Sequence, residues 1–213
     1  MNTALSAFSG QQEDVLKMVS VASFNYPQRQ EKMLEIKDIL YQAISEYQEK
    51  RILSDIAQGE STDAINAIFS HCVSHLDKID GSRQSVLGSL AEGLTHYLLT
   101  LAMIPSQRKT SFQSVDIDVA IPDARTLSTS PEEVVIMYFP KTDELQTINE
   151  NLDRLRKIQP KSDNIWLVAD RPIPVDAKVY TLDREQFSFA RIINDLVSFT
   201  AGKKQSKLKI FRI

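Results

Sequence analysis

Cysteine, glycine and long hydrophobic runs are all scarce in this sequence. Cys72 is the single cysteine among 213 residues, so no internal disulfide can form, and we expect a reducing compartment, the cytoplasm. It lies in a helical pattern without an identifiable partner base, which predicts a buried thiol rather than a nucleophile. The six glycines form no G-x-G-x-x-G array, which excludes that phosphate-binding loop. No stretch approaches the ~18 consecutive apolar residues of a membrane span, so we expect no membrane contact.

Basic residues are concentrated at the end of the chain. The net charge of the whole chain is −3, so the overall charge does not favour binding to nucleic acid. The cluster consists of Lys203, Lys204, Lys207, Lys209 and Arg212. Three interpretations are open. The lysines contact phosphates of a nucleic acid, or they guard an edge strand at Lys207–Ile213 against pairing with another sheet. In the third, the segment resembles the peptides that dock on sliding clamps, with Arg212 in place of the second aromatic residue, through Gln205, Leu208 and Phe211.

The first 80 residues have the periodicity of helices. Apolar residues recur every three or four positions from residue 28 to residue 57, which predicts one long amphipathic helix. A shorter helix is expected at Glu13–Val21, and another after a cap at Ser61 or Thr62. We therefore expect residues 1–80 to form an all-helical region that offers a surface for a protein partner or a homodimer.

From residue 81 helices and strands alternate, so we expect a second, α/β domain over residues 81–213. Apolar and polar residues alternate at Ser114–Ile121, as in a half-buried strand. The run at Val134–Phe139 is wholly apolar, as in a strand buried on both faces. A strand, a helix and a strand in succession predict a parallel pair. The other expected elements are the helices Ser85–Ile104, Asp143–Ile158 and Gln186–Phe199 and the strands Ile165–Val168 and Val179–Leu182.

Three short segments of this domain carry polar residues in a familiar order. They are the helix segment Gly88-Ser89-Leu90-Ala91-Glu92, the strand aspartates Asp116 and Asp118, and the strand end Phe139-Pro140-Lys141. Together they resemble the PD-(D/E)xK nuclease superfamily, and the archaeal Holliday-junction resolvases are the branch nearest in length and order. The resemblance covers about residues 85–199. It implies a restriction-endonuclease-like core, a mixed central sheet flanked by helices, after the helical N-terminal region.

The resemblance also implies roles for individual residues. Asp118 matches the first acid, with Asp116 as a register-shifted alternative; Lys141 matches the lysine, and Glu92 the helix glutamate. In such a site, acids on neighbouring strands bind Mg²⁺ through oxygen ligands, and the lysine orients water or offsets phosphate charge. The implied catalytic residues are therefore Asp118, Lys141 and Glu92, the implied metal ligands are Asp118 and Asp116, and the implied partner is DNA.

Phe139 departs from the pattern of this family. It stands two positions before Lys141, where the family has Asp or Glu, and phenylalanine cannot ligate Mg²⁺. The sequence therefore predicts a catalytically degenerate, nuclease-like domain that binds nucleic acid or serves as an interaction scaffold. One alternative is an active Mg²⁺-dependent endonuclease whose carboxylate has moved to Glu150 or Asp153 of the following helix. Another is a protein–protein adaptor that uses the N-terminal helices.

The histidines offer a weaker signal. His71 and His75 are four residues apart on one expected helix, a spacing that can bind zinc. No glutamate follows His71 and no third ligand is evident from the sequence. We therefore expect both to be polar positions on a helix.

Overall fold

The computed structural model describes residues 27–76, 79–183 and 187–209. The chain forms two compact units, Met1–Leu34 and Glu35–Ile213. Of the first unit, the described part is the start of helix α2 (Pro27–Tyr47). The second unit contains the five strands of the described sheet. The helix expected at Glu13–Val21 lies outside the described residues.

The prediction of a single long helix from residue 28 to residue 57 is wrong, because the helix is interrupted at Gln48. There the backbone φ is 71°, in the left-handed region, and it separates α2 from α3 (Glu49–Gln58). The apolar periodicity continues across this break, so the hydrophobic pattern does not reveal it. Helix α3 ends at Gly59, where a φ of 77° suits a residue without a Cβ. Helix α4 (Ser61–Val73) follows.

Helix α5 (Arg83–Leu101) leads into the sheet. The helix begins at Ser82, whose side chain accepts a hydrogen bond from the Ser85 N–H. The sheet has the order β1-β2-β3-β4-β5; its first three strands are antiparallel and its last three are parallel. The strands are β1 (Gln107–Phe112), β2 (Val115–Ile121), β3 (Val135–Tyr138), β4 (Ile165–Ala169) and β5 (Lys178–Thr181).

Two further helices complete the described chain. Helix α6 (Leu145–Ile158) connects β3 to β4, so the expected parallel pair is confirmed. Helix α7 (Ile192–Lys209) runs through the basic segment, so the edge strand expected at Lys207–Ile213 is wrong as far as Lys209. Apolar and polar residues alternate only weakly in this short segment, and the backbone continues the helix that precedes it instead of forming a strand. Short 3-10 helices lie at Arg125–Ser128, Pro131–Glu133, Ser162–Asn164 and Phe189–Arg191.

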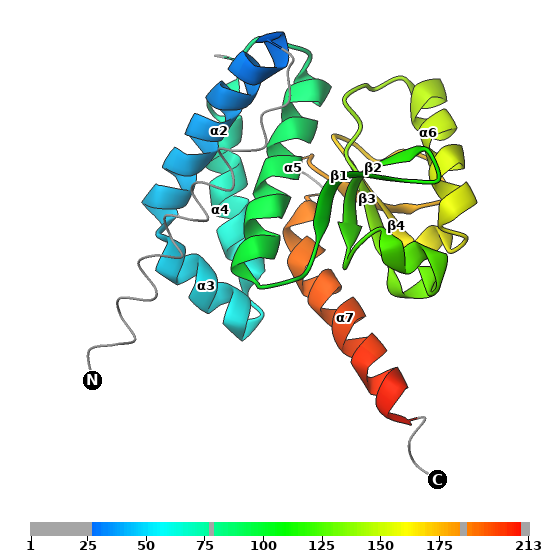
Figure 1. Ribbon diagram of the computed structural model, residues 1–213. Coiled ribbons are helices and arrows are strands. Elements are labelled where there is room, and N and C mark those ends of the chain that lie inside the picture. Colours follow the sequence, from blue (N-terminus) through cyan, green and yellow to red (C-terminus); the bar gives the residue numbers. More distant parts are fainter. Residues whose placement is uncertain (1–26, 77–78, 184–186, 210–213) are drawn as a thin grey trace, which may run out of the picture. The chain divides into compact units, whose positions relative to one another are not determined.

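The sheet separates two hydrophobic cores. Val135 and Met137 of β3 belong to the core that contains α5, whereas Ile136 belongs to the core that contains α6. Figure 1 shows α5 and α6 on opposite sides of the strands. Because successive side chains of a strand point to opposite faces, a strand covered on both sides has a continuous apolar sequence. This is why the sequence identifies β3.

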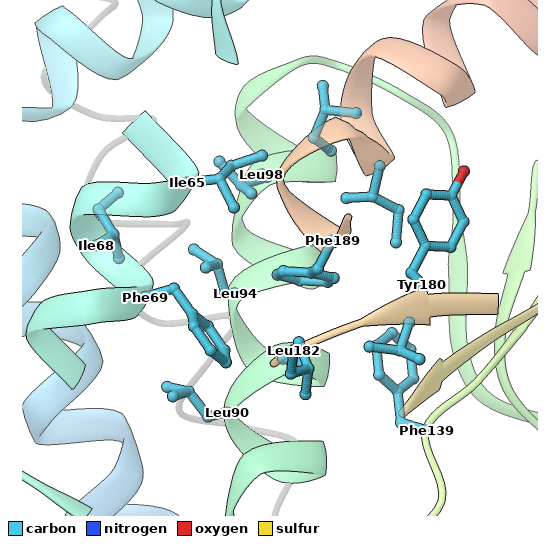
Figure 2. Close-up of a cluster of buried hydrophobic side chains, with 14 of the residues drawn as sticks. Ile65, Ile68, Phe69, Leu90, Leu94, Leu98, Phe139, Tyr180, Leu182 and Phe189 are labelled. Atoms are coloured by element: carbon cyan, nitrogen blue, oxygen red, sulfur yellow. The ribbon is translucent and has the colours of Figure 1, made fainter. Parts of the chain in front are cut away.

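The first core extends into the N-terminal helices. Phe69 of α4 packs in one cluster with Leu90 and Leu94 of α5 and with Phe189 (Figure 2). Ring centroids of Phe69 and Phe189 are 5.8 Å apart. Buried contacts thus cross the expected boundary at residue 80, and the division into 1–80 and 81–213 stays a prediction. No helix in the described part of the chain is both long and apolar enough to cross a membrane.

Candidate functional site

Glu92 is a buried carboxylate of α5 that is surrounded by three cations. Its side chain is only 3% exposed. Arg108 Nε donates to Oε1 at 3.1 Å, Lys109 Nζ lies 2.8 Å from the same oxygen, and Lys141 Nζ donates to Oε2 at 3.0 Å. Burial alone raises the pKa of Glu92, but the charges of Lys141, Lys109 and Arg108 outweigh it and hold the pKa at about 2. Glu92 is therefore ionised at neutral pH and fixes three cationic side chains in one place.

A close approach of α5 to the end of β3 makes this arrangement possible. A Cβ on Gly88 would lie 2.7 Å from Pro140 O, closer than real Cβ atoms come. One turn earlier, the buried Gln84 donates from Nε2 to the same oxygen at 3.1 Å. Gln84, Gly88 and Glu92 are spaced by four residues and so share one helix face. Because this face contacts the backbone just after β3, Lys141 is placed beside Glu92.

Asp118 lies on β2, next to the end of β3. Its Oδ2 accepts a hydrogen bond of 2.8 Å from the Phe139 N–H, and its Oδ1 is 3.8 Å from Lys109 Nζ. Burial raises the pKa of Asp118; the Phe139 N–H acts against this rise, and the negative charge of Glu92 adds to it. The structure thus brings together Asp118, Glu92 and Lys141, the three residues that the family resemblance assigns to one site.

Lys141 follows β3 after a single proline. Its side chain is 30% exposed, and its Nζ lies 6.0 Å from the centroid of the Phe139 ring. Burial lowers the pKa of Lys141, while the charges of Glu92 and Asp118 act to raise it. The ammonium is therefore held between a buried carboxylate and the surface, where it can meet an anion.

Strand β1 provides two cations, Arg108 and Lys109, that the sequence pattern does not predict. The strand reads Gln-Arg-Lys-Thr-Ser-Phe, so no apolar alternation marks it. It pairs with β2 across a two-residue turn, Gln113 and Ser114, whose φ values of 50° and 64° suit a type I′ hairpin. Gln-Ser lacks the Asn-Gly signature of such turns. The one sequence feature that could have indicated this strand is the basic pair Arg108 and Lys109, which precedes the alternating segment of β2 by a few residues, as the first strand of a hairpin would.

Phe139 contributes no oxygen ligand. Its side chain is 1% exposed and belongs to the first core, as Figure 2 shows. Within the described residues, no group of three or more His, Cys, Asp or Glu side chains is placed to hold a metal ion. Both oxygens of Glu92 are bound to cations of the chain itself. As they stand, these residues do not fit a resident Mg²⁺, which needs free carboxylate oxygens.

The other proposed carboxylates lie apart from this cluster. Asp116 is exposed on β2, and the ion pairs formed among described residues do not include it. Glu150 and Asp153 are exposed on α6, where Glu150 accepts from Gln146 Nε2 at 3.0 Å and Asp153 pairs with Arg156 at 2.7 Å. These contacts to neighbours on the same helix are typical of a solvated helix face.

The thiol and the histidine pair lie on and after α4. Cys72 is buried and free, and burial raises the pKa of its thiol to about 12, which confirms the expected buried thiol. His71 Nδ1 lies 3.0 Å from Glu46 Oε2, and the rings of His71 and His75 stack with centroids 4.8 Å apart. Even with Glu46, these side chains do not form a group that could hold a metal ion, and the described residues contain no such group. The pair therefore remains a polar contact between α2 and α4.

The basic C-terminal segment is helical as far as Lys209. Its four lysines belong to α7, but their side chains, like all of Arg212 and Phe211, lie outside what the structure describes. Contact with nucleic acid and docking on a sliding clamp through Gln205, Leu208 and Phe211 stay predictions.

The comparisons with known proteins concern the fold. No protein-family model and no curated protein matches the chain. Among solved structures, it is similar to the restriction endonuclease PspGI in its complex with substrate DNA, with a TM-score of 0.53 and 14% sequence identity over 78% of this chain and 93% of that one. This chain has a restriction-endonuclease-like fold. The expected class, a mixed sheet flanked by helices after a helical region, is confirmed; a likeness at this identity does not distinguish a branch.

Proposed function

We propose that the chain binds DNA, without cleaving it, at the edge of the sheet where α5, β1 and the end of β3 meet. The observation that carries this proposal is the surplus of positive charge there. Arg108, Lys109 and Lys141 surround two carboxylates, Glu92 and Asp118. Three positive and two negative charges leave a local charge of +1, in a chain whose net charge is −3.

The cations of this cluster are more accessible than the carboxylate that holds them. The side chains of Lys109, Lys141 and Arg108 are 56%, 30% and 24% exposed, whereas that of Glu92 is 3% exposed. An approaching phosphate therefore meets ammonium and guanidinium groups before it meets Glu92. That the similar PspGI structure is a complex with DNA lends the proposal further support.

Two features support binding without cleavage. Phe139 is buried in the core at the position where the nuclease family has a carboxylate. Both oxygens of Glu92 are bound to side-chain cations, so this carboxylate is not free to ligate a metal. A nuclease-like domain that has lost catalysis accounts for both, and it agrees with the sequence-based prediction of degeneracy.

An active Mg²⁺-dependent DNA endonuclease is the second candidate. The observation in its favour is that Asp118, Glu92 and Lys141 meet at one end of the sheet. In this case Asp118 and Glu92 would hold the ion, which would have to displace lysine from Glu92. The resemblance to Holliday-junction resolvases makes branched DNA the substrate to include in the test.

Fluorescence anisotropy of the full chain with duplex, single-stranded and four-way-junction DNA tests the proposal. At low salt with EDTA we expect binding that weakens as salt rises, because phosphate contacts release counterions. With Mg²⁺ or Mn²⁺ we expect the DNA to stay intact. Cutting that Lys141→Ala abolishes would establish the endonuclease instead. Failure to bind any of the three DNAs would contradict both and favour the adaptor, with residues 1–80 as its docking or dimerisation surface.

The basic segment of α7 is the second DNA contact that we propose. Its lysines would add phosphate contacts that do not depend on the Glu92 cluster, by which we mean Glu92, Asp118, Arg108, Lys109 and Lys141. A chain that ends after Gly202 should bind DNA more weakly and with a smaller salt dependence than the full chain. If the truncated chain binds equally well, the segment serves another purpose, and docking on a sliding clamp is the one to test.

A further inference from the structure

Lys109 reaches from β1 into the space between two carboxylates of other elements. Its Nζ lies 2.8 Å from Glu92 Oε1 on α5 and 3.8 Å from Asp118 Oδ1 on β2. We propose that the Lys109 ammonium is a built-in cation that takes the place of a divalent metal ion between Glu92 and Asp118. The proposal deepens the proposed function, on which it rests for its DNA-binding consequence, by making that binding independent of a divalent ion.

The backbone at Lys109 supports a specific role for its side chain. Its φ is 49°, in the left-handed region that residues with a Cβ rarely adopt. The regular pairing of β1 with β2 continues on either side, at Arg108 with Val119 and at Thr110 with Ile117, and omits Lys109. Strained backbone in the middle of a strand persists where the surrounding structure requires it. Here it accompanies a side chain directed at Glu92.

Electrostatics explain why a cation belongs at this position. Because Glu92 Oε1 and Asp118 Oδ1 lie 2.8 Å and 3.8 Å from the same Lys109 Nζ, the two carboxylates are close to each other, and a positive charge between them offsets their repulsion. A lysine tethered to β1 needs no free ion and is present at every metal concentration. A divalent ion would have to displace it and lose hydration water, which Mg²⁺ gives up reluctantly.

Removing the Lys109 ammonium should therefore free one acceptor position on Glu92 Oε1, beside Asp118 Oδ1, which a metal ion can take while Arg108 and Lys141 keep their contacts with Glu92. We expect the full-length Lys109→Met variant to bind one Mn²⁺ at least about tenfold more tightly than the unmodified chain, since a nearby positive charge no longer repels it. Mn²⁺ titration followed by the electron paramagnetic resonance signal of the free ion measures this directly. The gain should disappear when Asp118→Asn is added to Lys109→Met. Lys178→Met is the matched control, because in the ion pairs of the described residues Lys178 meets one carboxylate, Asp195, whereas Lys109 meets two.

The outcomes are distinct from those that test DNA binding itself. If Lys109→Met and a second variant, Lys109→Gln, both melt cooperatively and neither gains Mn²⁺ affinity, the proposal is wrong. It is equally wrong if the unmodified chain already binds Mn²⁺ as tightly as the variants and Glu92→Gln removes that binding. If the chain binds DNA, it should bind in EDTA without any divalent ion, and added Mg²⁺ should weaken binding as other salts do; a requirement for Mg²⁺ would overturn the proposal. If it binds no DNA, the proposed function fails while the Mn²⁺ titration still decides the role of Lys109.

Discussion

Two lysine–carboxylate contacts in the described part of the chain differ in their charge balance. At the Glu92 cluster, Arg108, Lys109 and Lys141 surround Glu92, with Asp118 nearby. At the second place, Asp195 of α7 accepts hydrogen bonds from Lys178 Nζ at 2.8 Å and from the Tyr180 hydroxyl at 2.7 Å, both on β5. The individual contact distances are nearly the same.

The difference lies in what remains after the pairs are formed. Asp195 forms an ion pair with Lys178 and also feels the charge of Arg191, and the Lys178 ammonium lies 4.4 Å from the centroid of the Trp166 ring. Burial alone would raise the pKa of Asp195, but the hydrogen bonds of Lys178 and Tyr180 outweigh it and lower the pKa. The pair itself thus consists of one ammonium and one carboxylate, and the contact ties α7 to β5. The Glu92 cluster, with three cations and two carboxylates, keeps one positive charge that is not balanced within the cluster. This charge is suited to binding an external anion such as a phosphate.

Neutralising each carboxylate should give the largest difference between the two places. Glu92→Gln leaves three cations around an uncharged, 3% exposed side chain, and we expect it to lower the free energy of unfolding by about 3 kcal/mol. Asp195→Asn removes a negative charge on a side chain that is 24% exposed, with an expected loss of about 1 kcal/mol. Urea denaturation of the full chain measures both. Equal losses would mean that the surplus of cations at Glu92 has no energetic consequence.

Lowering the pH should show how much the ionised Glu92 carboxylate stabilises the folded chain. The pKa of Glu92 in the folded chain is about 2, below its ordinary value of 4.5. A lowered pKa stabilises the folded state fully above about pH 4.5, and this contribution is lost as the pH falls toward about 2. The stability difference between the unmodified chain and Glu92→Gln should therefore shrink across that range and be constant above it. Urea denaturation at several pH values tests this; a difference that does not change with pH would show that ionised Glu92 does not stabilise the fold.

The sequence predicts the parts of the site whose elements have a strong hydrophobic period. Glu92 and Asp118 lie on the helix and strand expected for them, and Lys141 follows the apolar run of β3. That these three residues lie close together was expected only from the resemblance to the nuclease superfamily, in which the elements follow the same order. Their roles in chemistry stay predictions, because geometry alone does not assign them.

The rest of the site depends on contacts that leave no pattern in one sequence. Strand β1 is stabilised by pairing with β2 rather than by an apolar face, so its residues Arg108 and Lys109 were missed. The close packing at Gly88 depends on the position of Pro140 O, which belongs to a segment more than fifty residues later. The break at Gln48 is a backbone conformation within a continuous helical period.

The two regions also respond differently to the same glycine substitution. Gly88→Ala places a Cβ 2.7 Å from Pro140 O, so helix and strand end must separate, and we expect a loss of about 2 kcal/mol. Gly202→Ala is the matched control in α7, where a Cβ meets nothing within 4 Å and alanine should stabilise the helix by about 1 kcal/mol. Thermal melts compare the two. If Gly88→Ala is neutral, α5 does not need this approach to hold Glu92 beside Lys141.

The smallest expected effect is on DNA affinity, and it tests the difference in charge balance most directly. Lys141→Ala removes a surplus cation, which should weaken binding about fivefold for every DNA sequence and lower the salt slope by about 1. Lys178→Ala removes a lysine of comparable exposure from the balanced pair, so binding and salt slope should stay unchanged. Anisotropy titrations over a series of salt concentrations measure both quantities. Equal weakening by the two variants would mean that DNA senses the total charge of the chain, and the Glu92 cluster would then lose its claim to be the contact surface.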